Sequence, residues 1–396
     1  MRGPAVRPIV IAAGGTGGHF YPAEALAVEL IRRGQRVVLM TDARSGALHS
    51  QVFDPRDQYV LPGAGIAGRG GIKAGKAVLA MAAGAARARG IMTRIQPAAV
   101  VAFGGYPSVP PVLAARLVRP RPPVILHEQN AVLGRANRFL SRHAALLALS
   151  FAATSRVPMG ARIAVTGNPV RPAIAALIDV PYVPPLAGIH LLVLGGSLGA
   201  RVFSDVVPAA LRALPADLRA RLRVTQQCRA EDMERVRTAY AADGIVADLA
   251  PFFTDVADLL SEAHLVIARA GASTVAELAV AGKPAILVPL PGAIDDHQTA
   301  NASALAAAGG AWVLPQAAFT PPALTPPALT SLAFTPLAFT PLSFTPLALT
   351  ERLAALLTDP AALVHAAQCA RSVAQSGATA ALAGLVEQMA HEEIVA

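Results

Sequence analysis

Two glycine-rich loops, each directly after a short apolar run, constrain the fold of this chain more than any other feature. The first, GGTGGH at 14–19, follows the run at 8–13, and the second, GGSLGA at 195–200, follows the run at 189–194. Glycines between a strand and a helix let backbone N–H groups approach a phosphate at the helix N-terminus. Two such loops predict two Rossmann-like domains that face each other across a cleft.

Apolar runs alternate with helical patterns along the whole chain, which predicts an α/β protein with doubly wound parallel sheets. The expected strands are 8–13, 36–41, 98–103, 123–127, 145–149, 162–166, 189–194, 222–226, 245–249, 265–268, 285–288 and 311–314. The expected helices are 22–33, 73–94, 107–118, 133–141 and a last stretch at about 360–391.

The length of 396 residues fits two domains better than one. We expect an N-terminal domain at 1–170, with a C-terminal helix at about 376–396 that packs back onto it, and a C-terminal domain at 171–375. A proline-rich segment at 181–185 is typical of a linker between domains. We interpret the five-residue repeat at 319–350 as an extended surface loop, because its period matches neither helix nor strand. Most of it, 320–349, is expected to be dispensable.

The charge is divided unevenly along the chain. Residues 1–190 carry a net charge of +15 and residues 191–396 a net charge of −6. A basic first half indicates an anionic partner such as a nucleic acid, an anionic lipid or a pyrophosphate, although a solvated surface would have the same composition. The two cysteines lack metal-ligand spacing, which favours a reducing compartment. No apolar stretch is long enough and free enough of prolines to span a bilayer.

Polar residues gather where predicted strands end, which is where open α/β sheets bind ligands. The first half offers FGGYPS at 103–108 and HEQN at 127–130. His19, at the helical end of the first loop, is a candidate general base or anion donor. Asp42 ends the second predicted strand, where a nicotinamide cofactor's ribose would bind, so that an oxidoreductase that uses Gly14–Gly18 stays open as an alternative.

In the second half, the segment at 269–277 follows a predicted strand and opens a helix. Thr274 and Glu277 fit a capping box, and this structural interpretation is sufficient alone. In the functional alternative, N–H and OH groups of this segment point at a diphosphate, and Glu277 accepts hydrogen bonds from the hydroxyls of a ribose. The polar loop at 289–298 is suited to contact a sugar. Because no Asp-x-Asp occurs in the chain, a metal-bound diphosphate is not expected, and helix dipoles and N–H donors would stabilise a leaving group.

Taken together, these motifs resemble the MurG family of bacterial glycosyltransferases, glycosyltransferase family 28. The matching segments, in the family's order, are GGTGGH (14–19), FGGYPS (103–108), HEQN (127–130), GNPVR (167–171), GGSLGA (195–200), RAGASTVAEL (269–278) and DDHQTANA (295–302). The resemblance implies the two-domain GT-B fold, with UDP-sugar in the C-terminal domain and the acceptor on the N-terminal one. It also implies inverting transfer of N-acetylglucosamine from UDP-N-acetylglucosamine to the 4-hydroxyl of undecaprenyl-pyrophosphoryl-MurNAc-pentapeptide, without a cofactor or metal.

The family's functional positions are carried over residue by residue. We expect His19 to be the catalytic base or oxyanion partner, with Glu128 as the alternative. The positions implied to contact substrate are Thr16, Gly17, Gly18, Asn130, Arg171, Ser197, Phe253, Ala272, Ser273, Thr274, Val275, Ala276, Glu277 and Gln298. His297 is expected to assist Gln298 at the sugar.

The implied partners are UDP-N-acetylglucosamine, the lipid-linked muramoyl-pentapeptide pyrophosphate and an anionic membrane surface, with no nucleic acid. We expect peripheral attachment to the cytoplasmic face of the cell membrane through residues 65–94, which mix apolar positions with cations and contain no acid. Two alternatives remain beside the oxidoreductase, namely another GT-B nucleotide-sugar transferase and a nucleotide-sensing binding protein.

Overall fold

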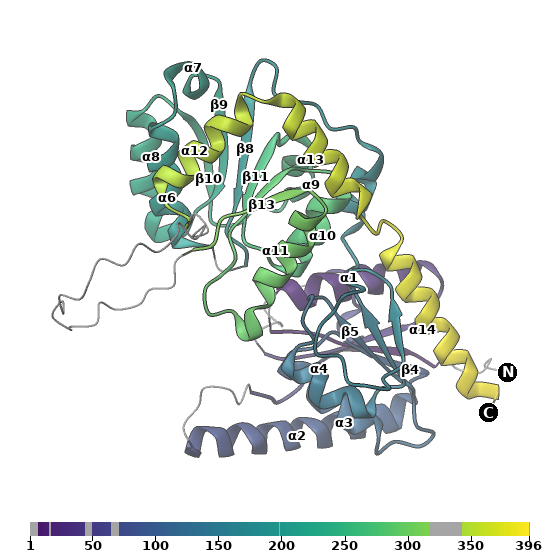
Figure 1. The fold of residues 1–396 in the computed structure, drawn as a ribbon. Coiled ribbons are helices and arrows are strands. Elements are labelled where there is room, and N and C mark those ends of the chain that lie inside the picture. Colours follow the sequence, from purple (N-terminus) through teal and green to yellow (C-terminus); the bar gives the residue numbers. More distant parts are fainter. Residues whose placement is uncertain are drawn as a thin grey trace, which may run out of the picture. The chain divides into compact units, whose positions relative to one another are not determined.

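The chain forms two compact units, each built around one sheet. The computed structural model describes residues 7–15, 17–43, 50–64, 71–197, 199–316 and 343–395. The first unit comprises Met1–Asp179, Gly271–Ala281 and Ala374–Ala396, and the second comprises Val180–Ala270 and Gly282–Val373. The chain therefore passes into the second unit after Asp179, returns to the first unit for Gly271–Ala281, and returns to it again at Ala374. Figure 1 shows the elements of both units.

The first unit contains a parallel sheet in the order β3-β2-β1-β4-β5-β6-β7. Its strands are β1 (Ile9–Ala12), β2 (Val37–Thr41), β3 (Gln58–Val60), β4 (Ala99–Ala102), β5 (Val124–Glu128), β6 (Leu146–Leu149) and β7 (Ile163–Val165). Its helices are α1 (Gly17–Arg32), α2 (Gly71–Ile95), α3 (Val109–Ala115), α4 (Arg135–Leu140), α5 (Pro172–Ala175), α10 (Ala272–Ala281) and α14 (Ala378–Val395).

The central strands of this sheet are buried on both faces, which explains their unbroken apolar sequence. Along β1, Ile9 and Ile11 belong to one core cluster, whereas Val10 and Ala12 belong to a second cluster on the other face. Helix α14 contributes to the first cluster through residues such as Val386. The C-terminal helix is thus part of the core of the first unit.

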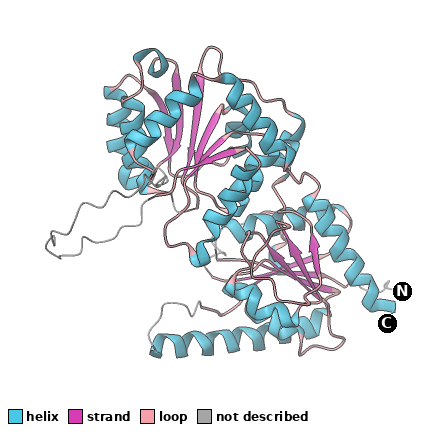
Figure 2. Ribbon diagram, in the orientation of Figure 1, coloured by secondary structure: helices cyan, strands magenta, loops and turns pink. Residues whose placement is uncertain are grey.

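The second unit also contains a parallel sheet, and Figure 2 draws the strands of both sheets in magenta. The strand order of this second sheet is β10-β9-β8-β11-β12-β13. Its strands are β8 (Ile189–Leu194), β9 (Leu222–Gln227), β10 (Val246–Ala250), β11 (Leu265–Ala268), β12 (Ala285–Leu287) and β13 (Ala311–Val313). Its helices are α6 (Arg201–Arg212), α7 (Ala216–Arg219), α8 (Met233–Ala242), α9 (Val256–Glu262), α11 (His297–Ala307), α12 (Pro346–Leu357) and α13 (Pro360–Ser372).

Both glycine loops follow the strand at which the order of the sheet reverses. β1 pairs with β2 on one side and β4 on the other, and β8 pairs in the same way with β9 and β11. Ligands of open parallel sheets bind at this switch point, outside the carboxyl ends of the strands. The topology therefore places each loop where a ligand is expected.

The strands expected from the sequence are all present, each within one residue at either end. The unexpected strand β3 is a three-residue edge strand without a buried residue, so it carries no apolar run. The expected helix at 22–33 begins earlier, at Gly17, with Pro22 inside it. The stretch expected at 360–391 is two helices, α13 and α14, separated at 373–377.

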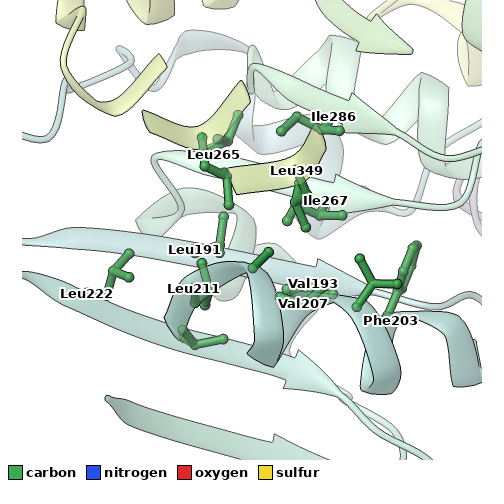
Figure 3. Close-up of a cluster of buried hydrophobic side chains, with 14 of the residues drawn as sticks. Leu191, Val193, Phe203, Val207, Leu211, Leu222, Leu265, Ile267, Ile286 and Leu349 are labelled. Carbon is green, nitrogen blue, oxygen red and sulfur yellow. The ribbon is translucent and has the colours of Figure 1, made fainter. Parts of the chain in front are cut away.

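The interpretation of 319–350 as a surface loop is wrong at its C-terminal end. Residues 317–342 lie outside the described residues, but Phe344 is buried against Phe203, with ring centroids 5.5 Å apart. The Thr345 hydroxyl accepts from the Ala348 N–H, and α12 begins at Pro346, the helix position at which proline is favoured. Leu349 belongs to the same core cluster as Ile267 and Ile286 (Figure 3). The final repeat units therefore form a capped helix whose apolar face is in the core.

Within the described ranges, no single helix is long and apolar enough to cross a membrane. Among the described helices, one pair, α12 with α13, meets the length and hydropathy requirement when taken together, and its two helices are bent by 95°.

Burial in α12 can be tested with two leucines of the same turn. Leu349 is fully buried and Leu347 is 70% exposed. Leu349→Ala should lower the free energy of unfolding by about 2–5 kcal/mol, because it leaves a cavity in the core. Leu347→Ala should change it by less than about 0.5 kcal/mol. Denaturant titration measures both, and equal effects would contradict the assignment of 343–350 to the core.

Candidate functional site

The first glycine loop is fixed by the carboxylate of Asp42. Gly15 has a φ of 85° and donates its N–H to Asp42 Oδ1 at 3.1 Å. The Tyr106 hydroxyl donates to the other oxygen of this buried carboxylate. One oxygen thus holds the glycine loop and the other holds Tyr106, which argues against Asp42 as the ribose ligand of a nicotinamide cofactor. Thr16 lies outside the described residues.

The FGGYPS segment lies beside this loop, but its two hydroxyls are used within the protein. Tyr106 bonds to Asp42, and the buried Ser108 hydroxyl donates to the Gly104 carbonyl at 2.7 Å. Both hydroxyls thus donate to groups of the protein itself. Gly104 and Gly105 have φ values of 83° and 68°, a backbone conformation that favours glycine.

Glu128 ends β5 and organises the turn that follows it. Its Oε1 accepts from the backbone and side-chain N–H groups of Asn130 at 3.0 and 2.9 Å. Its Oε2 accepts from Gly134 N at 2.8 Å and Asn137 Nδ2 at 2.9 Å. A buried carboxylate that accepts four hydrogen bonds has a structural role in the turn. This arrangement argues against Glu128 as the general base and shows that it orients Asn130.

His19, by contrast, is half-exposed at the start of α1. Its Nδ1 lies 2.8 Å from Gln129 Oε1, and Gln129 Nε2 lies 2.9 Å from His127 Nδ1. The HEQN segment therefore brings His127 and Gln129 into one hydrogen-bonded series with His19, which the sequence pattern did not predict.

Arg171 and Glu277, both predicted to bind substrate, contact each other. Arg171 Nη2 lies 3.2 Å from Glu277 Oε1, and the guanidinium lies 5.3 Å from the centre of the Tyr21 ring. Burial raises the pKa of the Glu277 carboxyl, and Arg171 opposes this by lowering it. Burial is also the largest cause of the raised pKa of Tyr21. The sequence separation of Arg171 and Glu277 gave no sign of this pair.

The capping box proposed for Thr274 and Glu277 is wrong. Helix α10 begins at Ala272, so Thr274 already lies in its first turn and Glu277 lies one turn further. Ala272 and Val275 are buried, whereas Ser273, Thr274 and Ala276 are partly exposed. The start of α10 therefore presents a polar side of small residues, and capping does not account for Glu277.

Helix α10 also contacts the first glycine loop. The Ser273 hydroxyl donates to the Gly18 carbonyl at 3.3 Å. Pro22 has no N–H and cannot form the helical bond to this carbonyl, which explains why it is available to a side chain. Gly17 is buried and Gly18 is exposed. The structure thus brings together Gly18, Ser273, Arg171 and Glu277, which come from three of the predicted motifs.

The second glycine loop is held by a side chain that the sequence analysis missed. Gln227, at the end of β9, accepts from Gly195 N at 3.0 Å and donates to the Gly196 carbonyl at 3.0 Å. A Cβ on Gly195 would lie 2.5 Å from Ala200 N, so only glycine fits. Ser197 is exposed on this loop. The position of Gln227, a polar residue at the end of a strand, is the sequence feature that could have indicated this role.

The remaining predicted positions lie in the second unit, on one loop and at the start of α11. Phe253 is half-exposed between β10 and α9. Gln298 Oε1 accepts from Leu290 N at 3.0 Å, so this side chain closes the loop before α11. His297 Nδ1 bonds to the Ile294 carbonyl at 2.7 Å. Arg269 also holds the loop that precedes α11, because its buried guanidinium donates to Pro289 O at 3.1 Å. Burial lowers the pKa of Arg269 to about 10.

Among the described residues, no group of three or more His, Cys, Asp or Glu side chains is placed to hold a metal ion.

Comparison with known proteins identifies relatives of the whole chain. Models of the glycosyltransferase family 28 N-terminal and C-terminal domains match residues 9–148 and 190–335. A protein of Granulibacter bethesdensis, named UDP-N-acetylglucosamine–N-acetylmuramyl-(pentapeptide) pyrophosphoryl-undecaprenol N-acetylglucosamine transferase, is 60% identical, with 98% of this chain and 95% of the relative covered. A protein of the same name from Gluconobacter oxydans is 51% identical, with 96% and 98% covered.

A solved structure shows the same architecture. The crystal structure of Acinetobacter baumannii MurG aligns with a TM-score of 0.70 at 30% identity and covers 96% of this chain and 99% of that one.

The structural role of Glu128 predicts a stability effect. Glu128→Gln places an NH₂ group against N–H donors, so the free energy of unfolding should fall by about 1–3 kcal/mol. Glu234→Gln, at a side chain that is 85% exposed, is the matched control and should change little. Denaturant unfolding compares the two. An unchanged unfolding free energy in Glu128→Gln would contradict the four-bond description.

Proposed function

The chain belongs to glycosyltransferase family 28, and from this premise we propose that it transfers N-acetylglucosamine from UDP-N-acetylglucosamine to the 4-hydroxyl of undecaprenyl-pyrophosphoryl-MurNAc-pentapeptide. The observation that carries this proposal is 60% identity, over 98% of the chain, to a relative whose name states this transfer. The chain is accordingly a hexosyltransferase of the GT-B fold. Both carboxylate oxygens of Asp42 accept hydrogen bonds within the protein, which argues against the oxidoreductase alternative.

The proposed reaction is a single displacement at the anomeric carbon. The acceptor oxygen attacks C1 of N-acetylglucosamine from the face opposite the UDP oxygen, the C1–O bond to UDP breaks, and the configuration inverts. The acceptor's hydroxyl proton passes to His19, and UDP leaves with the bonding electron pair. His19 is favoured over Glu128 because it is half-exposed, whereas the Glu128 carboxylate already accepts four hydrogen bonds.

The leaving diphosphate requires stabilisation of its negative charge. We assign this task to the N–H groups at the start of α10, to Ser197 on the second glycine loop and to Arg171, since fixed donors and helix N-termini stabilise developing anions. The Arg171–Glu277 pair supports a role of Glu277 as a ribose acceptor, because the guanidinium holds the carboxylate in place. We retain Phe253 for the uracil and Gln298 for the sugar from the family resemblance. The sequence lacks Asp-x-Asp, which favours transfer without a metal.

This proposal predicts a separation of catalysis from nucleotide binding in a His19→Ala variant. Loss of a general base typically costs about 10²–10⁴-fold in rate, so kcat should fall by that order. The affinity for UDP, measured by calorimetry, should remain nearly unchanged.

The matched control is His391→Ala, at an exposed histidine on α14. Full turnover in His19→Ala would remove His19 from the mechanism. UDP binding by the wild type without sugar transfer to the lipid acceptor would overturn the proposed transferase and favour a nucleotide sensor.

We also propose that the protein visits an anionic leaflet at the cytoplasmic face of the membrane through α2. This helix buries Ala77, Ala88 and Met92 but exposes Val78 and Leu79, which are 53% and 72% accessible. Lys76, Arg87, Arg89 and Arg94 are exposed along the same helix. Exposed apolar side chains flanked by cations suit the interface of an anionic bilayer. Residues 65–70, part of the predicted surface, lie outside the described residues.

Neutralising Arg87, Arg89 and Arg94 together to glutamine should weaken binding to anionic vesicles, since each basic residue contributes about 1 kcal/mol near such a surface. Vesicle sedimentation at rising salt measures this. The control neutralises Arg201, Arg212 and Arg237, three exposed arginines of the second unit. Equal binding by both triple variants, or equal wild-type binding to neutral vesicles, would contradict the assignment.

A further inference from the structure

A series of hydrogen bonds runs from His19 into the core of the first unit. Gln129 Oε1 lies 2.8 Å from His19 Nδ1, and Gln129 Nε2 lies 2.9 Å from His127 Nδ1. His127 Nε2 in turn lies 2.9 Å from the carbonyl oxygen of Gly167. His127 and Gln129 are 0% and 1% exposed, so solvent does not compete for these bonds.

Two backbone carbonyls determine which atom donates in each bond, because a carbonyl oxygen can only accept. At the inner end, the Gly167 carbonyl requires a proton on His127 Nε2, so that His127 Nδ1 carries a lone pair. In the middle, Gln129 Nε2 also lies 3.2 Å from the His127 carbonyl, which fixes its amide nitrogen toward His127. The Gln129 oxygen therefore faces His19 and requires a proton on His19 Nδ1.

The surroundings of His127 keep its imidazole neutral, which is required if Nδ1 is to accept a hydrogen bond from Gln129. Burial lowers the pKa of His127 to about 4 and outweighs the opposing hydrogen bond to Gly167. The Phe103 ring packs against the imidazole, with centroids 5.1 Å apart. Gly167 has a φ of 84°, and a Cβ there would lie 2.8 Å from the Cβ of Ala378, so α14 holds the acceptor carbonyl in place.

We propose that Gln129 and His127 are positioning residues that hold His19 in the tautomer with its proton on Nδ1 and its lone pair on Nε2. A Cβ on Gly105 would lie 3.5 Å from Nε2, so glycine at this position leaves that edge of the ring uncovered. The inference rests on the proposed function for its consequence, because Nε2 is then the atom that receives the acceptor's proton. Gln129 Oε1 accepts from Nδ1–H before and after this transfer, so the bond need not rearrange.

The tautomer can be measured without reference to activity. Nitrogen-15 NMR of wild-type protein with labelled histidines distinguishes protonated from unprotonated ring nitrogens, and the spectrum of His19→Ala identifies the signals of His19. We expect neutral His19 to carry its proton on Nδ1 and His127 to carry its proton on Nε2. A neutral His19 with its proton on Nε2, or a mixture of tautomers, would overturn the proposal.

Kinetics of three variants test the consequence for transfer. Gln129→Leu removes the acceptor for Nδ1–H, and His127→Phe keeps an aromatic ring but removes the acceptor for the Gln129 amide. We expect kcat to fall at least about tenfold in Gln129→Leu and less in His127→Phe, since the wrong tautomer disables a histidine base. KM for both substrates and the affinity for UDP should change by less than about twofold, because neither residue is assigned to substrate.

The double variant should be no slower than Gln129→Leu, because His127 acts only through Gln129 and coupled residues are not additive. Gln35→Leu is the control, since Gln35 also donates one side-chain hydrogen bond in the first unit, to Glu387 at 3.0 Å. Additive losses, or losses confined to KM, would overturn the positioning role.

Failure of this inference is distinguishable from failure of the proposed function. If His19→Ala loses turnover whereas Gln129→Leu retains it, the transferase stands and the positioning role is wrong. If the wild type transfers no sugar but shows the expected tautomers, the arrangement is right and the proposed function is wrong.

Discussion

The central strands of the first sheet are covered on both faces by apolar side chains, so polar side chains are accommodated where the strands end. In the first unit, Asp42, Glu128 and Gln129 all lie at or just beyond such ends and are all buried. A buried polar group without a hydrogen-bond partner destabilises the folded state, and each of these three side chains makes hydrogen bonds. These bonds fix the loops on which the proposed site of the first unit lies.

This constraint gives the predicted residues different tasks. Glu128 accepts hydrogen bonds within the turn that it stabilises, and Asp42 accepts one from the first glycine loop. His19, by contrast, makes one hydrogen bond to the buried Gln129 and remains half-exposed. In the second unit, too, a polar side chain at a strand end fixes a loop, because Gln227 at the end of β9 accepts a hydrogen bond from the second glycine loop. The proposed base, His19, is thus held in place by a buried polar side chain, Gln129.

The sheets were predictable because burial on both faces leaves apolar runs such as that of β1, and the loops because glycine is required at Gly15 and Gly195. Polar contacts were not predictable in the same way. Nothing local distinguishes Glu128, which is enclosed, from His19, which is not. The pair of Arg171 with Glu277 joins residues far apart in the chain. The repeat near Phe344 was misjudged because its period of five concealed a helix start at Pro346.

The central claim is that His19 accepts the proton of the acceptor hydroxyl during sugar transfer. The most direct test is the single-turnover rate constant for transfer at saturating substrates, measured in wild type and in His19→Ala. We predict that this rate constant is about 10²–10⁴-fold lower in His19→Ala, because the acceptor hydroxyl then has no general base. An unchanged single-turnover rate constant in His19→Ala would contradict the account.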